Sequence, residues 1–82
     1  MAEYLLLTRP DCHLCEEFLD ELLGEFPEVA VMTAQACVDD SEDWQRRYGL
    51  KIPVLLDSVG QPICAGRLDA EAVRESLRDL KS

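Results

Sequence analysis

The feature that most constrains the fold of this chain is a pair of cysteines at the junction of two differently patterned segments. Cys12 and Cys15 follow a short apolar run, Tyr4–Thr8, and stand at the start of a segment with helical periodicity. The apolar run predicts a strand that is buried on both faces. Cysteines three residues apart on the first turn of a helix share one face, so they can form a disulfide or grip one metal ion. The junction therefore predicts a β-α unit that presents a reactive sulfur.

The composition predicts a single domain over residues 1–82, with 48% hydrophobic and 30% charged residues, as in globular proteins. The formal net charge of −9 argues against nucleic acid, whose phosphates need Lys and Arg, and against anionic membrane surfaces. No apolar run approaches the ~20 residues that span a bilayer, and no signal peptide is evident. We therefore expect a cytoplasmic monomer, in which cysteines serve redox or metal chemistry more often than structural cross-links.

The predicted elements follow the order βαβαββα. Strands are expected over Tyr4–Thr8, within Val29–Val38, over Val54–Leu56 and over Gln61–Ala65. Helices are expected over His13–Glu25, between an N-cap at Asp39, Asp40 or Ser41 and a stop at Gly49, and after an N-cap at Asp69. Two β-α-β units predict parallel strands with right-handed crossovers, and a hairpin and a helix then close the layer. Cys12 is expected at the carboxyl end of the first strand, where open α/β sheets place their chemistry.

Charges around the cysteine pair act in opposite directions. The helix N-terminus and Arg9 favour a thiolate at Cys12. The carboxylates of Asp11, Glu16 and Glu17 disfavour a second negative charge beside them. The sequence leaves the balance between these effects open.

Three motifs together carry a resemblance to a known family. They are Cys12-His13-Leu14-Cys15, Gly49-Leu50-Lys51-Ile52-Pro53-Val54 and Ala65-Gly66-Arg67-Leu68-Asp69. With them the chain resembles thioredoxin-fold proteins, and most closely the small glutaredoxins and the short bacterial glutaredoxin-like proteins. The resemblance spans nearly the whole chain and implies an α/β thioredoxin-like fold with a four-stranded mixed sheet flanked by helices. His13-Leu14 departs from the Pro-Tyr that glutaredoxins commonly have between the cysteines, and Ala65-Gly66 departs from their usual Gly pair.

The resemblance implies a thiol–disulfide oxidoreductase. Cys12 would be the nucleophile, and Cys15 would resolve the mixed disulfide that Cys12 forms. Pro53 would be a cis proline facing the cysteines, and the bond before it would turn the backbone of Ile52 towards an extended thiol peptide. The expected partners are a disulfide-containing protein or small thiol as substrate, and glutathione or a reductase as electron donor.

The resemblance also implies a glutathione site. Arg9 matches the basic residue that glutaredoxins carry three positions before the nucleophile, where it can meet a glutathione carboxylate. Gly66 and the backbone of Asp69 match the glutathione-binding loop and helix N-terminus, a natural carboxylate site. Glutathione would then be a co-substrate, and no bound cofactor is expected.

Other interpretations remain open. The chain can be a non-catalytic module that holds partners in the groove facing the proline, because fold does not fix function. It can also carry an iron–sulfur cluster or zinc through Cys12. Zinc ligands could come from Cys12, His13, Cys15 and a further cysteine, but His13 is expected to point away, so no metal site is predicted. Cys37 and Cys64 are expected to be small core residues on strands.

Overall fold

Strand β1 (Tyr4–Thr8) lies in the interior of the sheet in the computed structural model, which describes residues 3–81 and their side chains through residue 79. Successive side chains of a strand point to opposite faces, and the adjacent Leu6 and Leu7 are both fully buried. The strand is therefore covered on both faces, as its apolar run predicts.

The sheet has four strands in the order β2-β1-β3-β4. The other three strands are β2 (Thr33–Cys37), β3 (Val54–Leu56) and β4 (Pro62–Ala65). Strand β2 pairs with β1 in parallel, whereas β3 is antiparallel to both β1 and β4. The expected mixed four-stranded α/β sheet and its terminal hairpin are confirmed.

The expectation of parallel strands in the second β-α-β unit is wrong, because β3 runs antiparallel to β1. The register explains the difference. Cys37, the last residue of β2, pairs with Thr8, and Val54, the first residue of β3, pairs with Leu7. The connection thus leaves and re-enters the sheet at the same end. Its helix has seven residues, about 10 Å in length, and it does not return along the sheet as a parallel crossover must.

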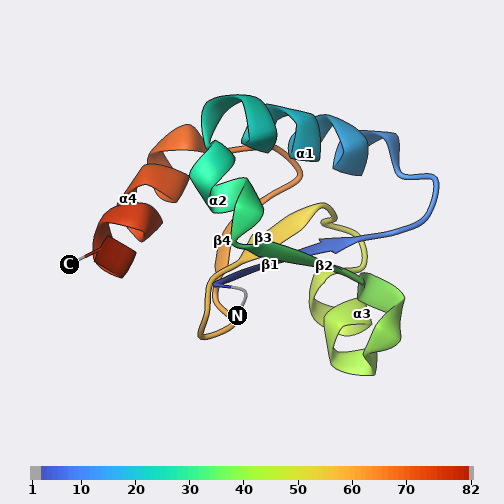
Figure 1. Cartoon of the computed structure of the whole chain (residues 1–82). Coiled ribbons are helices and arrows are strands. Elements are labelled where there is room, and N and C mark those ends of the chain that lie inside the picture. Colours follow the sequence, from blue (N-terminus) through green and yellow to red (C-terminus); the bar gives the residue numbers. More distant parts are fainter. Residues whose placement is uncertain (1–2, 82) are drawn as a thin grey trace.

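Helices cover the two faces of the sheet unequally (Figure 1). They are α1 (His13–Glu25), α2 (Pro27–Val31), α3 (Glu42–Tyr48) and α4 (Ala70–Lys81), with a short 3-10 turn, η1 (Val38–Asp40), before α3. Helices α1, α2 and α4 lie over one face, where Leu6 and Leu55 meet Phe18 and Leu22. Helix α3 lies on the other face. None of the helices described here is long and apolar enough to cross a membrane.

Helix α2 is not among the expected elements, because the sequence pattern predicts only a strand within residues 29–38. The strand begins only at Thr33. Pro27 at the first helical position has the φ of a helix and lacks the N–H that a helix start leaves unpaired, so it starts a short helix. Val29 is fully buried against the core around Phe26, and this packing outweighs the strand preference of a β-branched residue.

Side-chain N-caps begin both α3 and α4. Ser41 is the N-cap of α3 and accepts a hydrogen bond from the backbone N–H of Trp44 at 3.3 Å. The carboxylate of Asp69 accepts one from the N–H of Ala72 at 3.2 Å at the start of α4. Both predicted caps are confirmed, and Ser41 is the one that caps among the three candidates.

Candidate active site

Cys12 and Cys15 are joined by a disulfide at the junction of β1 and α1, with their Cα atoms 5.2 Å apart. Cys12 is the N-cap of α1, and its Sγ accepts a hydrogen bond from the backbone N–H of Cys15 at 3.1 Å. Cys12 is half-buried, whereas Cys15 is 5% exposed. Only the first sulfur is therefore placed for attack on a substrate from solvent, and a thiolate there would meet the positive end of the helix.

A hollow of about 240 Å³ opens beside the two sulfurs. It is lined by Arg9, Asp11, Cys12, Cys15 and Glu16, together with Gln35 of the edge strand β2. The site thus lies at the carboxyl end of β1, as predicted. Asp11 has a φ of +58°, a left-handed conformation that Asp tolerates better than most residues, and this turn leads the chain from the strand into α1.

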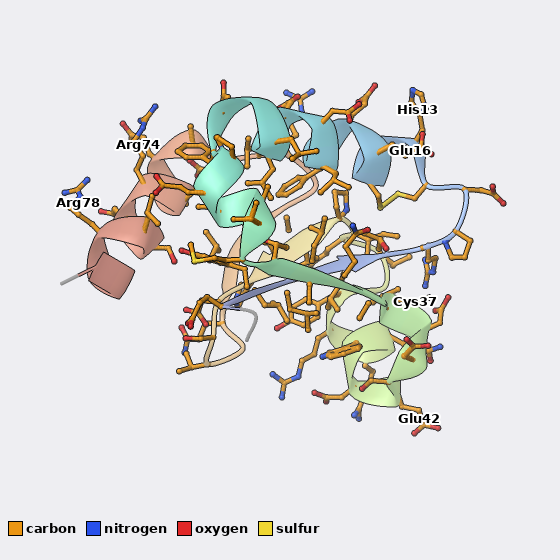
Figure 2. All side chains as sticks on the ribbon, viewed as in Figure 1. His13, Glu16, Cys37, Glu42, Arg74 and Arg78 are labelled. Carbon is orange, nitrogen blue, oxygen red and sulfur yellow. A yellow bond between two sulfur atoms is a disulfide. The ribbon has the colours of Figure 1, made fainter. Side chains whose placement is uncertain are left out.

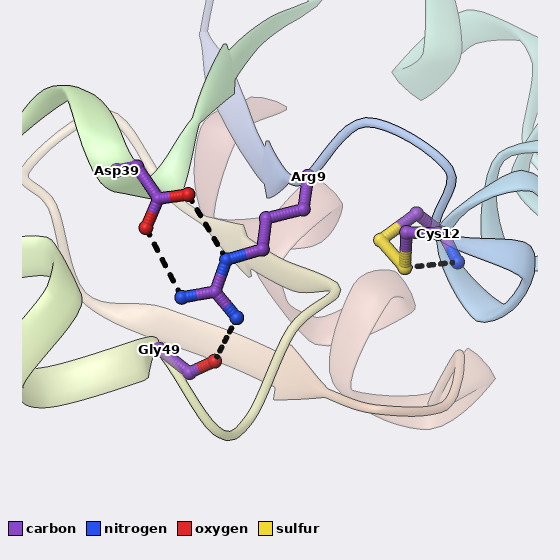
Figure 3. Close-up of a disulfide and its surroundings, with 5 residues drawn as sticks. Arg9, Cys12, Asp39 and Gly49 are labelled. Atoms are coloured by element: carbon purple, nitrogen blue, oxygen red, sulfur yellow. Dashed lines mark hydrogen bonds and ion pairs between the residues drawn. A yellow bond between two sulfur atoms is a disulfide. The ribbon is translucent and has the colours of Figure 1, made fainter.

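The guanidinium of Arg9 is held by α3 and the turn before it (Figure 3). Its Nε and Nη2 donate to the two carboxylate oxygens of Asp39, each at 3.1 Å, and its Nη1 donates to the carbonyl of Gly49 at 2.9 Å. The hydrogen bonds with Asp39 raise the pKa of Arg9, and those from Arg9 lower the pKa of the Asp39 carboxyl. We call these three residues the Arg9 clamp. The assignment of Arg9 to a glutathione carboxylate stays a prediction.

The Ile52–Pro53 peptide bond is cis, and Pro53 is fully buried. Pro53 immediately precedes Val54, which pairs with Leu7, so the proline lies at the same end of the sheet as the disulfide. Its carbonyl accepts a hydrogen bond from the N–H of Gly66 at 2.7 Å. Gly66 has a φ of +78°, a conformation that glycine adopts without strain. Pro53 and Gly66, far apart in the sequence, are thus adjacent.

A second hollow, of about 390 Å³, lies between α1 and the loop that contains Gly66. Leu14, Glu17 and Glu21 line it from α1, and Arg67 lines it from the loop. The Asp69 carboxylate lies at the end of this loop and caps α4. The predicted site residues therefore fall into two groups: Arg9 with the cysteines, and Gly66 with Pro53.

The imidazole of His13 is 83% exposed and its Nε2 lies 3.3 Å from Oε1 of Glu17. Figure 2 shows the side chain pointing away from the sheet, as predicted. Within residues 3–81, no group of three potential ligands could hold a metal ion.

Cys37 and Cys64 are free thiols at half-buried positions on β2 and β4. The sulfur of Cys37 lies 3.9 Å from Oδ2 of Asp39, beside the Arg9 clamp. Burial raises the pKa of Cys64, whose side chain packs against the larger core cluster. Cys64 thus packs against the core, whereas Cys37 belongs to neither core cluster, so the expectation of a core residue is wrong for Cys37.

Three contributors to this region were not singled out from the sequence. Asp39 was considered only as a helix cap, and its pairing with Arg9 spans thirty residues. Gln35 lines the first hollow, and the available signal was a polar residue within a strand pattern. Leu14 enters the sequence analysis only as part of the cysteine motif, and in the structure it is 55% exposed and lines the second hollow.

Comparison with known proteins decides the family. The model of the glutaredoxin-like domain family (DUF836) matches residues 3–78. The chain belongs to this glutaredoxin-like family. Protein XcR50 from X. campestris, solved by X-ray methods, is 32% identical, with a TM-score of 0.67 over 93% of this chain and 96% of its own. A search of the curated proteins finds no match.

A second structure supports the fold of this glutaredoxin-like protein. The solution structure of protein Ne2328 from Nitrosomonas europaea superposes with a TM-score of 0.77, at 24% identity. The match covers 89% of this chain and 87% of that one. Together with the mixed sheet and its helices, these neighbours establish the thioredoxin-like fold that the three motifs implied.

Proposed function

We propose that this glutaredoxin-like protein is a thiol–disulfide oxidoreductase that uses Cys12 and Cys15. The observation that carries the proposal is the disulfide at the start of α1, in which Cys12 is half-buried and Cys15 is buried. A structural disulfide that closes only three residues of chain adds little entropic stabilisation, because that contribution grows with loop length. Its position at a helix N-terminus instead suits reversible chemistry.

In the reduced protein, the Cys12 thiolate attacks one sulfur of a substrate disulfide. The substrate S–S bond breaks, a Cys12–substrate bond forms, and the released thiolate takes up a proton. The Cys15 thiol then loses its proton and attacks the Cys12 sulfur, which releases the second substrate thiol. The substrate gains two electrons, and the protein is left with the Cys12–Cys15 disulfide. Two thiols of a donor, either glutathione or a dithiol reductase, return it to the reduced form.

The remaining predicted site residues would bind the substrate. The backbone of Ile52, before the cis peptide bond, would pair with an extended peptide, and Pro53 and Gly66 would form the floor of that groove. Arg9 and the backbone of Asp69 would hold a carboxylate of glutathione. In this proposal the protein is cytoplasmic and works as a monomer without a bound cofactor.

The test is reduction of a small neutral disulfide, bis(2-hydroxyethyl) disulfide, by the prereduced protein. The expected result is loss of reactivity in Cys12→Ser and a trapped mixed disulfide at Cys12 in Cys15→Ser, detected by mass. Cys64→Ser is the matched control, because burial keeps this thiol neutral, and its reactivity should equal that of wild type. An unreactive wild-type Cys12 would refute the proposal and favour a non-catalytic binding module.

A further inference from the structure

The surface around the disulfide carries an excess of carboxylates. Asp11 and Glu16 line the hollow beside the sulfurs, and Glu17 and Glu21 line the second hollow. All four residues are exposed, so their charges are accessible to a molecule that binds at these two hollows. Figure 2 shows Glu16 at the start of α1.

The nearby guanidiniums balance this charge only in part. Arg9 lines the first hollow, but its charge is offset by the two-pronged contact with Asp39. Figure 3 shows its side chain extending towards Asp39 and Gly49, on the side away from the disulfide. Arg67 lines the second hollow together with two carboxylates. The surroundings of both hollows are therefore net negative.

An exposed apolar side chain lies within the same surface. Leu14 stands between the two cysteines in the chain, is 55% exposed and lines the second hollow. A small thiol gains little from such a contact, whereas a polypeptide can cover Leu14 with an apolar residue while its disulfide reaches Cys12. The apolar contact and the exposed carboxylates together fit a polypeptide with basic side chains.

We propose that the Cys12–Cys15 pair selects polypeptide disulfides flanked by Lys or Arg and disfavours substrate disulfides that carry negative charge. This inference rests on the proposed function and names its substrate class. The helix N-terminus stabilises the attacking thiolate for every substrate alike, so it does not discriminate between them. The carboxylates of Asp11, Glu16 and Glu17 do discriminate, because they attract a cationic substrate and repel an anionic one. We call these three carboxylates the acidic ring.

The test compares three disulfides of similar size and different charge. They are cystamine, which carries two positive charges, neutral bis(2-hydroxyethyl) disulfide, and dianionic 3,3′-dithiodipropionate. Prereduced protein is mixed with an excess of each, quenched with an alkylating reagent, and the loss of the doubly alkylated Cys12–Cys15 peptide is followed by mass. This single-turnover format needs no electron donor.

The readout is the ratio of the cystamine rate to the dithiodipropionate rate, compared between proteins. The intrinsic reactivity of each disulfide is the same in every experiment, so it cancels when the ratios of two proteins are compared. A change in the acidity of Cys12 alters the rates of all three disulfides by the same factor, so it cancels within each ratio. In the triple variant Asp11→Asn, Glu16→Gln, Glu17→Gln, we expect the ratio at low salt to fall about tenfold, from the loss of three charges close to the sulfur. The wild-type ratio should itself decrease as salt is added.

A matched triple variant controls for total charge. Glu25→Gln, Glu42→Gln and Glu75→Gln remove the same number of charges at the far end of α1, on α3 and on α4. We expect its ratio to stay within about twofold of wild type, because these charges lie on elements away from the cysteines and the Coulomb energy falls with distance.

The possible failures are distinguishable. If wild-type Cys12 does not react with the neutral disulfide, the proposed function itself is refuted. If the neutral disulfide reacts but the acidic-ring variant keeps the wild-type ratio, charge selection is refuted and the oxidoreductase stands. If the rate ratio of the control variant falls as much as that of the acidic-ring variant, the selection depends on total charge, and the role of the acidic ring is refuted. The salt dependence of the wild-type ratio is an independent check, and a ratio unaffected by salt would contradict the inference whether or not the variants fold.

Discussion

At the scale of a single residue, Asp11 has a backbone conformation that the cysteine motif alone does not predict. It directly precedes Cys12 in the chain and has a φ of +58°, so the turn before Cys12 uses a left-handed residue that is not glycine. Its carboxylate also belongs to the acidic ring. Backbone conformation and charge are thus combined at one position.

We predict that Asp11→Val lowers the free energy of unfolding by about 1 kcal/mol, because a β-branched side chain fits the left-handed region poorly. Asp11→Asn should leave the stability nearly unchanged, because Asn tolerates this conformation and has the same shape. Urea denaturation of the oxidised proteins measures both. Equal stabilities of Asp11→Val and Asp11→Asn would show that the turn relaxes to another conformation at no cost.

The sequence predicts a contact between residues where the two residues lie close together in the chain. The pairing of Cys12 with Cys15 and the cap at Asp69 follow from residues a few positions apart, and the structure contains both. The contact between Arg9 and Asp39 joins residues thirty positions apart, and only the fold brings them together. The sequence therefore predicts the cysteine pair, but it does not show that Asp39 binds Arg9.

At the scale of elements, the Arg9 clamp connects the end of β1 to both ends of the α3 region. Asp39 belongs to η1, the turn before α3, and Gly49 is the C-cap of α3. A Cβ atom added at Gly49 would lie 2.5 Å from the carbonyl oxygen of Gln45 and 3.4 Å from Nη2 of Arg9, so the close approach requires glycine here. The clamp attaches the short α3 to the end of β1, the strand that precedes the cysteines.

Removing the carboxylate should loosen this attachment. We predict that Asp39→Asn lowers the melting temperature by a few degrees at neutral pH, since the charge-assisted pair with Arg9 is lost. Arg9 lowers the pKa of Asp39, so the pair stabilises the fold above the ordinary carboxyl range, and this stability is lost as the pH falls through the lowered value. The difference between wild type and variant should therefore shrink in acid.

The measurement is thermal unfolding of wild type and Asp39→Asn between neutral pH and strong acid. Asp40→Asn is the matched control, because it removes the same charge from the neighbouring residue of η1, where the structure gives no contact with Arg9. A difference for Asp39→Asn that stays constant through acid pH, or an equal effect of Asp40→Asn, would contradict the role of the ion pair.

The elements themselves were predictable where one pattern dominates. Helix α1 and strand β1 have the predicted bounds, since long periodicity and a continuous apolar run are unambiguous. Helix α2 does not follow from the sequence pattern, because its five residues are too few to show a helical period. The direction of β3 depends on where the α3 connection returns to the sheet, and no local pattern encodes that.

At the scale of the whole molecule, the formal net charge of −9 acts on a body with a radius of gyration of 11.7 Å and a longest extent of 33 Å. At 0.01 M salt the Debye length is about 30 Å, comparable to the molecule, so nearly all charges interact. At 1 M salt it is about 3 Å, and only adjacent charges do. Salt therefore tunes the self-repulsion of the folded chain without changing any contact in it.

We predict that the melting temperature rises by several degrees between 0.01 M and 0.5 M sodium chloride, because repulsion among the carboxylates is screened more than the close pair of Arg9 and Asp39 is weakened. The repulsion also opposes association, so the protein should sediment as a monomer at neutral pH and low salt. Near the sequence pI of about 4.3, where that repulsion disappears, it should associate. Thermal unfolding across the sodium chloride series measures the first effect, and sedimentation across a pH series measures the second.

The control for the melting temperature compares sodium sulfate with sodium chloride at equal ionic strength. A general salting-out effect would raise the melting temperature more in sulfate, whereas screening would raise it equally in both salts. A melting temperature that falls with sodium chloride would show that close ion pairs, rather than the excess of carboxylates, dominate the electrostatics of this fold.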